Sequence, residues 1–490
     1  MFFPIIEDIA QLKKIRYGKD DTVDIPVNVI ADHVRALVFA IADGIIPSNE
    51  ERGYVLRRIL RRAVRLSRNL GGNDAFLYKL VPRVVQLYAG AYPDIQNRRE
   101  EITGVIKSEE ERFLTTLEKG LQQFEEISRC KKVISGEDAF KLYDTYGFPF
   151  ELTQEIAGEK GLTTDEQGFL KMLDEARQLS KTRAKFVPRG EWQVQKQGHG
   201  IFSGYDKTEV QTHILRYNAY DKIVEIVLEE SPFYAEAGGQ VGESGELIGN
   251  EFLLEVTDTY WYQGMIVCHC QFRSGTPGML ATSDTILARV DITHRKESAR
   301  AHTATHLLHA ALRRILGEHA RQEGSYVEPG RFRFDFTHFK PLSEDEMTAI
   351  EDLVVEKILQ AIPVQKNEMP LDEAKKLGAM AIFGEKYGER VRVVRIADFS
   401  IELCGGIHLD NTGEIGFFKI ISQEAAAAGI RRIEAIVGKR LFAYVRKHDS
   451  IIKDLSKLTG RDEESIVTWV EETQEQIKKT EKEREQTLTE

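Results

Sequence analysis

The chain has 490 residues, 42% of them hydrophobic and 30% charged, which is typical of a globular protein with about three to four domains rather than one core. No apolar run approaches the roughly 20 residues of a membrane span, and the N-terminus has no basic region or cleavage site for secretion. A net charge of -11 argues against indiscriminate nucleic-acid binding, and four scattered cysteines exclude a disulfide framework, which fits a reducing cytoplasm.

Residues 1–200 are predicted to form a helical domain, because alternating apolar runs are few there. A helix is expected from Val29 to Gly44, where the glycine is a stop signal, and another over residues 54–68. Arginines follow one face of the second helix: Arg57, Arg58, Arg61, Arg62, Arg65 and Arg68. This stripe is either a solvated face paired with carboxylates or a binding face for phosphates. Few acids lie within the segment, so we favour phosphates.

Residues 201–295 are predicted to form a small β-barrel, because short alternating runs such as 222–228 and 252–256 are separated by glycines. The glycines of the loop at 231–242 permit close approach of its backbone to another surface. Cys268 and Cys270 share one face of a strand and His269 takes the other, so these three side chains cannot converge on a metal.

Residues 296–440 are predicted to form an α/β domain with a metal site. His302 and His306 lie four apart on one helix face, and Cys404 and His408 lie four apart around two glycines, which suits a tight loop. One such histidine pair alone is equally consistent with surface decoration, but two matching pairs favour zinc. A metalloprotease is excluded, because Thr303 occupies the position of the general-base glutamate.

The rest of this domain and the C-terminal segment can also be outlined. Strands are expected at 331–336, 391–396 and 429–438, and a helix from Ser343 to Ala361 begins with a capping box that includes Glu346. Residues 441–490 are predicted to be helical, with an intermittent apolar stripe. The predicted fold is therefore a multidomain α+β protein.

Five motifs resemble those of bacterial alanyl-tRNA synthetase, and the resemblance covers essentially the whole chain. Residues 302–309, 404–408 and 429–435 resemble its editing domain, and residues 30–35 and 52–58 resemble its tRNA-recognition domain. Freestanding editing proteins and threonyl-tRNA synthetases share the metal motifs but not those helices. The resemblance implies a chain without the N-terminal aminoacylation domain and without most of the C-terminal domain.

The resemblance also implies roles for particular residues. Asn49 and Asp144 would read the G·U pair in the acceptor stem of tRNA for alanine, since an amide and a carboxylate can bond base edges, although either could instead be a turn or cap residue. His302, His306, Cys404 and His408 would hold one zinc ion. Thr303 or Thr305, with Gln322, would line the pocket that hydrolyses seryl- and glycyl-tRNA. Zinc would either activate a water or position the substrate.

Some features separate this interpretation from its alternatives. The family usually has threonine at the position of Ile407, so any contact of that hydroxyl is lost here. One alternative is an RNA-binding fragment or subunit without deacylase activity; a zinc hydrolase of another class would need motifs such as H-E-x-x-H or G-x-S-x-G, which are absent. No phosphate loop or class II ATP motif is found, so alanine activation is expected to require an aminoacylation domain in cis or trans. Homodimerisation would use the C-terminal region.

Overall fold

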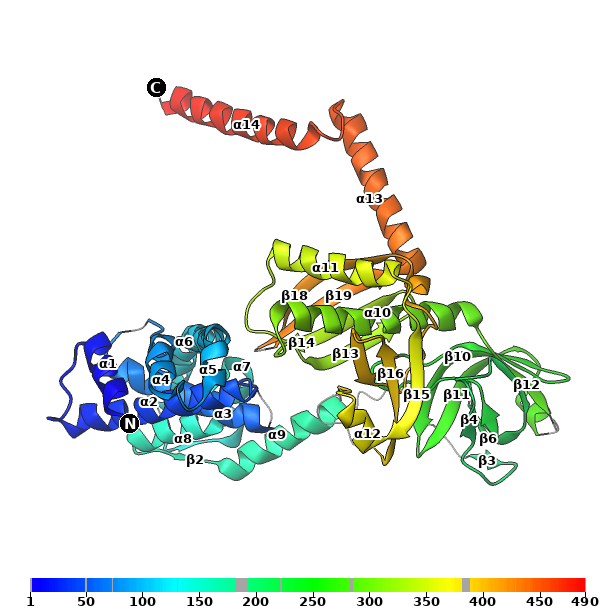
Figure 1. Cartoon of the computed structure of the whole chain (residues 1–490), viewed down its shortest axis with the longest axis horizontal. Helices are drawn as coiled ribbons and strands as arrows, with labels where there is room; N and C mark the ends of the chain where they lie inside the picture. The colour runs from blue at the N-terminus through cyan, green and yellow to red at the C-terminus, as the bar shows by residue number, and fades with distance from the viewer. Residues whose placement is uncertain are drawn as a thin grey trace.

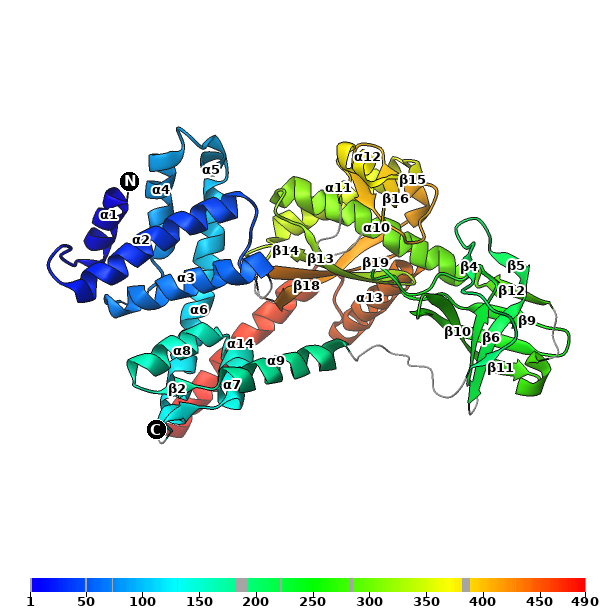
Figure 2. The ribbon, with the colours of Figure 1, turned by 90° about the horizontal axis from the view of Figure 1, so that it is seen from below.

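The computed structural model describes residues 2–48, 51–72, 74–129, 131–181, 192–220, 223–281, 285–380, 388–427 and 429–489. Figures 1 and 2 show a helical body, a sheet-rich region and, between them, a mixed α/β region from which two C-terminal helices extend.

The N-terminal body is helical, as predicted, and one hydrophobic core runs through it. Its helices are α1 (Phe3–Lys13), α2 (Asp21–Ala42), α3 (Glu51–Asn69), η1 (Leu77–Leu80), α4 (Val81–Tyr88), α5 (Pro93–Asn97), α6 (Arg99–Ser128), α7 (Gly136–Tyr146), α8 (Phe150–Glu159) and α9 (Glu166–Lys181). The two-residue strands β1 (Val133–Ile134) and β2 (Thr163–Thr164) pair in parallel. Gly44 has φ +85° just beyond α2, which confirms its role as a stop signal.

Helix α2 bears on the expectation that no apolar run approaches the length of a membrane span. Among the described residues it alone is long enough and, by its mean hydropathy, apolar enough to cross a membrane, but Asp32, His33 and Arg35 interrupt its apolar residues. Its apolar side packs into the body, and Ile30 and Val34 are fully buried. Helix α2 is therefore placed as a core helix of the body.

The second region is an eight-stranded antiparallel sheet in the order β3-β6-β7-β11-β10-β9-β12-β5. Its strands are β3 (Gln193–Val194), β5 (Glu209–Thr212), β6 (Ile214–Tyr220), β7 (Ile223–Leu228), β9 (Gly245–Ile248), β10 (Leu253–Tyr262), β11 (Met265–Ser274) and β12 (Ile286–Val290). No pairing joins β3 to β5 among the described strands, so the expected barrel is not closed by hydrogen bonds there. The sheet begins at Gln193, before the predicted boundary at 201. A separate parallel pair joins β4 (Ile201–Phe202) to β8 (Glu230–Ser231), and η2 spans Pro277–Leu280.

The alternation of Cys268, His269 and Cys270 is confirmed. Both thiols lie in the core of the eight-stranded sheet, whereas His269 faces the other side and pairs in register with Glu225. Burial raises the pKa of both thiols, which suits a structural role for them.

The α/β region contains two antiparallel sheets and the helices packed on them. One sheet has the order β13-β14-β19-β18 and the other β15-β16-β17. The strands are β13 (Gln322–Glu328), β14 (Arg331–Thr337), β15 (Val364–Pro370), β16 (Arg390–Ile396), β17 (Ser400–Leu403), β18 (Phe418–Ala427) and β19 (Ile430–Val437). The helices are α10 (Ile292–Leu316), α11 (Glu344–Leu359), α12 (Leu371–Lys376) and η3 (Thr412–Ile415). The capping box of Ser343 and Glu346 at the start of α11 is confirmed.

The C-terminal helices and the contact between the regions complete the fold. Helices α13 (Gly438–Thr459) and α14 (Ile466–Thr489) extend away from the α/β region (Figure 1). The helical body meets the α/β region where Phe339 lies against Gly104 of α6: a Cβ on that glycine would lie 2.6 Å from the ring. Ser108 donates a hydrogen bond of 2.7 Å to the Phe339 carbonyl.

Candidate metal centre and nucleic-acid interface

The structure brings the four predicted metal ligands together. His302 and His306 lie one turn apart on the buried helix α10, and Cys404 and His408 lie on the loop that follows β17. The ligand atoms of the four residues all lie within 4.8 Å of one another. The Cys404 sulfur is 3.4 Å from His302 Nε2 and 3.3 Å from His408 Nε2. Ligands on a tetrahedral zinc ion are separated by roughly 3.5 Å, so this donor set fits zinc.

Each of the three histidines has a polar partner on its Nδ1 side. His302 Nδ1 lies 2.7 Å from Gln240 Oε1, and His408 Nδ1 lies 3.2 Å from the Thr303 hydroxyl. His306 Nδ1 is 3.6 Å from a carboxylate oxygen of Glu402. Hydrogen-bond partners such as those of His302 and His408 orient imidazole ligands and select the tautomer that leaves Nε2 free for a metal, whereas the His306–Glu402 contact is too long for a hydrogen bond.

The electrostatic setting also suits metal binding. Burial lowers the pKa of His302, His306 and His408 below the ordinary value, so these imidazoles are neutral, which is the form that binds a metal. Burial alone would raise the pKa of Glu402, but the imidazoles of His306 and His309 outweigh that effect and the pKa is lowered. A buried carboxylate therefore faces the metal-binding helix.

A cavity of about 390 Å³ opens beside these ligands. Its wall includes Thr305 from α10, Gln322 and Ser325 from β13, and Arg390 and Arg392 from β16. Tyr234, Ala237 and Gly238, from the loop before β9, also line it. Thr305 donates its hydroxyl hydrogen to the carbonyl of Ala301 at 2.8 Å, and the Gln322 amide donates to the Ser325 hydroxyl at 3.1 Å. The cavity thus combines a metal-binding group with hydroxyl, amide and cationic groups.

Of the two threonines predicted to line the pocket, Thr303 or Thr305, the structure does not place Thr303 in the cavity wall. Its side chain is fully buried, and its hydroxyl contacts His408 and accepts a hydrogen bond of 3.2 Å from the Leu409 amide. It does not line the cavity. Thr303 therefore supports a metal ligand, and Thr305 is left as the threonine of the wall.

The glycine-rich loop makes the close approach that its sequence predicts. Gly239 has φ +80°, and a Cβ there would lie 2.4 Å from the Ser325 carbonyl oxygen. Its own carbonyl accepts a hydrogen bond of 2.7 Å from the Val327 amide. The next residue, Gln240, is the partner of His302 and was not predicted as a site residue. Its position directly after two glycines in this loop was the available signal.

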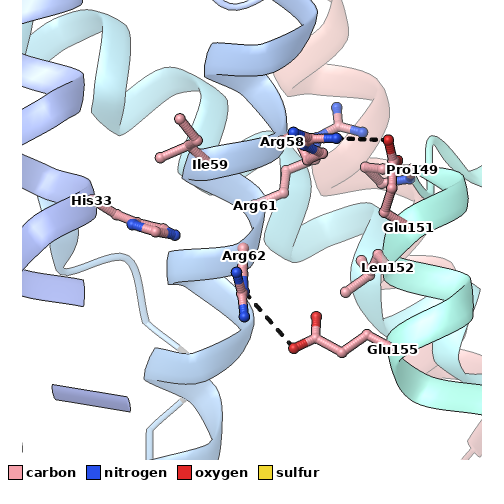
Figure 3. A pocket seen from close by; sticks show the side chains of 9 residues that line it. All are labelled: His33, Arg58, Ile59, Arg61, Arg62, Pro149, Glu151, Leu152 and Glu155. Carbon is pink, nitrogen blue, oxygen red and sulfur yellow. Dashed lines mark hydrogen bonds and ion pairs between the residues drawn. The ribbon is translucent and has the colours of Figure 1, made fainter. Parts of the chain in front are cut away.

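Two exposed arginines of the predicted stripe line a second cavity, of about 400 Å³, between α3 and α8. Figure 3 shows Arg58 directed at Glu151 and Arg62 directed at Glu155. Arg58 Nη1 is 2.8 Å from Glu151 Oε1, and Arg62 Nε is 3.8 Å from Glu155 Oε1. The Arg58 and Arg62 side chains are 44% and 52% exposed, so both guanidinium groups remain accessible. Phosphate binding by this pair stays a prediction.

Three of the other four arginines of the stripe are buried beside acids, although Arg61 still reaches the wall of the same cavity, and Arg68 is half-buried. Arg57, Arg61 and Arg65 are buried, with exposures of 2%, 8% and 6%. Glu109 lies 3.1 Å from Arg57 and 2.9 Å from Arg61, and Glu155 lies 3.0 Å from Arg65. Few acids do lie within the segment itself, but this did not decide the pairing of the arginines, because the acids that pair with them come from α6 and α8.

Of the two predicted base-reading residues, the structure describes Asp144 and not Asn49. Asp144 is exposed near the C-terminal end of α7, where a carboxylate could meet RNA. Asn49 lies outside the described residues. Close to Asp144 in sequence, Glu151 accepts a hydrogen bond of 2.9 Å from Tyr54, which joins α8 to α3.

Comparison with known families agrees with this site. A family model described as tRNA synthetases class II (A) matches residues 1–294, and one described as the threonyl and alanyl tRNA synthetase second additional domain matches residues 391–434. The second match contains Cys404 and His408. The chain therefore belongs to the class II tRNA synthetases.

Individual relatives narrow the family. The alanine-tRNA ligases of Caldicellulosiruptor saccharolyticus and Fervidobacterium nodosum are each 44% identical to this chain in sequence. The alignments cover 98% and 99% of the chain, respectively. That of Listeria monocytogenes is 42% identical over 100% of it. The chain is a member of the alanyl-tRNA synthetase family, whose enzymes serve protein biosynthesis. It spans 56–58% of the length of these relatives.

Proposed function

We propose that this chain recognises the acceptor stem of tRNA for alanine and hydrolyses seryl- and glycyl-tRNA made in error. The observation that carries the proposal is the four-residue cluster of metal-ligand donors beside a cavity: His302, His306 and Cys404 lie in the cavity wall together with Thr305 and Gln322, and His408 completes the cluster. A synthetase pocket for alanine cannot strongly exclude glycine, which is smaller, or serine, which adds only a hydroxyl group. A second, hydrolytic site can remove the glycyl- and seryl-tRNA that such a pocket fails to exclude.

The side chains divide the work within the cavity. His302, His306, Cys404 and His408 would hold zinc, which would either activate a water or position the substrate. The Thr305 hydroxyl oxygen and the Gln322 amide, which line the cavity, would bond the hydroxyl or amino group of a seryl ester.

The helical body would contribute RNA binding. Arg58 and Arg62 are accessible cations that can contact phosphates, which position RNA without reading its sequence. Asn49 and Asp144 are proposed to read the G·U pair, because an amide offers a donor and an acceptor and a carboxylate accepts from an exocyclic amine. The two regions would then act on one RNA molecule.

Hydrolysis of labelled seryl-tRNA for alanine tests the proposal. The full chain should release serine, a chelator should stop the reaction, and added zinc should restore it. His306→Ala should abolish hydrolysis while RNA affinity is kept. Asp144→Ala should instead weaken the preference for G·U over G·C in RNA binding while zinc content is kept. If the zinc-loaded wild type releases no serine, the chain is an RNA-binding protein without deacylase activity.

The ligase reaction of the relatives is a separate question. We propose that this chain alone does not attach alanine to tRNA, because its sequence contains no phosphate loop and no class II ATP motif. An aminoacylation domain, in cis or in trans, would supply that step, and the protein would work in the cytoplasm, as a homodimer if the C-terminal region associates. Incubation with alanine, ATP and tRNA is the test, and alanyl-tRNA formation by the chain alone would overturn this part.

A further inference from the structure

The loop that carries Cys404 is held by its backbone carbonyls. Arg392 Nη1 donates hydrogen bonds to the carbonyls of Cys404 and Gly406, at 2.9 and 2.8 Å. The Tyr205 hydroxyl donates to the carbonyl between them, that of Gly405, at 2.5 Å. Three consecutive carbonyl groups are thus bound by two side chains from outside the loop.

These two side chains also support each other. The Arg392 guanidinium carbon lies 4.3 Å from the centre of the Tyr205 ring, a cation–π contact. Arg392 belongs to β16, whereas Tyr205 lies between β4 and β5, in the segment that leads into the eight-stranded sheet. The metal loop is therefore bound from two different regions of the chain.

The loop needs such support because it has little of its own. Gly405 and Gly406 have no side chains to pack, and glycine has more backbone freedom to lose than any other residue. A larger residue cannot replace Gly406, because a Cβ there would lie 2.0 Å from the His302 ring. Contacts to the loop backbone are therefore the means of fixing the conformation in which Cys404 and His408 face the helix α10 histidines. Gln240 accepts from the Ile407 amide at 3.0 Å, and Arg392 and Tyr205 bind the three carbonyls.

We infer that Arg392 and Tyr205 are positioning residues of the metal loop, and that they hold Cys404 and His408 in the geometry that binds zinc. The inference rests on the proposed zinc site but not on the proposed deacylation. Charge alone predicts the opposite effect for Arg392, because a guanidinium group near a bound cation repels it. Weaker zinc binding after loss of Arg392 would therefore indicate a positioning role, whereas tighter binding would indicate that only its charge matters.

Arg390 provides a matched control. It lies two residues from Arg392, so both side chains leave the same face of β16, and both line the cavity. Arg390 Nη2 donates a hydrogen bond of 3.4 Å to the Glu368 carbonyl, away from the loop. Replacing either arginine with glutamine removes one positive charge from the same wall.

The test is the zinc affinity of the full chain, measured by competition with a chelator of known affinity. Arg392→Gln should bind zinc about 10- to 100-fold more weakly. Tyr205→Phe, which keeps the ring, should lose about 2- to 10-fold. Arg392→Lys should bind zinc more tightly than Arg392→Gln but more weakly than the wild type, because an ammonium group can bond a carbonyl but lacks the planar guanidinium that lies against the Tyr205 ring. Arg390→Gln should bind zinc as tightly as the wild type or more tightly.

Cobalt in place of zinc gives a second readout. The absorption of a tetrahedral cobalt–thiolate site should weaken or shift in Arg392→Gln and keep its wild-type form in Arg390→Gln, while circular dichroism verifies the fold of each variant. Unchanged or tighter zinc binding by Arg392→Gln, or an equal loss in Arg390→Gln, would overturn the inference. If the wild type binds zinc but does not release serine from seryl-tRNA, the proposed function fails, and the zinc affinities of the variants still decide whether Arg392 and Tyr205 position the loop.

Discussion

Glu109 is the residue whose replacement should most disturb the helical body. It accepts from two buried guanidinium groups of α3, those of Arg57 and Arg61, and its own side chain is only 6% exposed. Glu109→Gln keeps the shape of the side chain but removes its negative charge. The two buried guanidinium groups would then share one neutral oxygen. Their charges would be left uncompensated inside the protein, which is why breaking a buried ion pair is costly.

The magnitude follows from burial and from the remaining partners. Breaking a buried ion pair typically costs about 3–5 kcal/mol. Arg57 also donates to the carbonyl of Pro47 at 3.0 Å, and Arg61 donates to that of Gly147, so the lower end of this range, about 3 kcal/mol, is expected. Burial already lowers the pKa of Arg57 to about 10, against the opposing effect of Glu109. The substitution removes that opposing effect.

Glu151→Gln is the matched control, because Glu151 pairs with the same helix at the surface. Its side chain is 40% exposed and that of its partner Arg58 is 44% exposed, so its loss should cost about 0–1 kcal/mol. Native-state hydrogen exchange of the α3 and α6 amides is the suitable assay, because a multidomain chain does not unfold in one step. Exchange should accelerate roughly 100-fold in Glu109→Gln and at most about fivefold in Glu151→Gln. Similar rates in both variants would refute the distinction between buried and exposed pairs.

Three further outcomes are expected. Replacing Arg58 and Arg62 with glutamine should weaken RNA binding without changing which RNA is preferred, and should lower the log-log salt slope by about one per lost contact; an unchanged slope would limit both arginines to their ion pairs. Cys404→Ala should lose its zinc in metal analysis, and full zinc content would contradict the ligand assignment. Burial lowers the pKa of His338 to about 4, so the unfolded chain takes up a proton first and stability should fall as the pH falls from about 6.5 towards 4. Denaturant unfolding should show a smaller loss over that interval in His338→Gln, and an equal loss would exclude this histidine as its source.

Local features were predictable from the sequence because they depend on short spacings. The helical period identified α2 and α3, the capping box identified the start of α11, and the period of two placed Cys268 and Cys270 on one face. The metal ligands were found for the same reason, since each pair lies four residues apart. The residues that support these ligands could not be found in this way, because Gln240 lies 62 positions before His302.

The arginine stripe shows where local spacing misleads. Spacing correctly placed the six arginines along one side of α3, but it could not show that α6 and α8 cover part of that side. Glu109 lies 48 positions from Arg61 in the sequence. Long-range pairing decides which charged side chains are buried, and composition within the helix itself contains no information about it.

The two threonines of α10 pose the same problem on a smaller scale. At 3.6 residues per turn, Thr303 and Thr305 flank the line of metal-binding histidines on opposite sides. Sequence therefore places both beside the metal and cannot say which side is open. The structure packs Thr303 against the loop that carries His408, and leaves Thr305 on the cavity side.

The candidate site exists only where four separate segments dock. Helix α10 brings two ligands, the loop after β17 brings two more, and the segments before β5 and β9 bring Tyr205 and Gln240 to hold them. None of these segments places four donors around one point by itself, so part of the free energy of the proposed zinc binding would be spent on, or supplied by, their docking. The zinc affinity of a variant changed far from the four predicted ligands would therefore report how well the eight-stranded sheet and the α/β region are assembled.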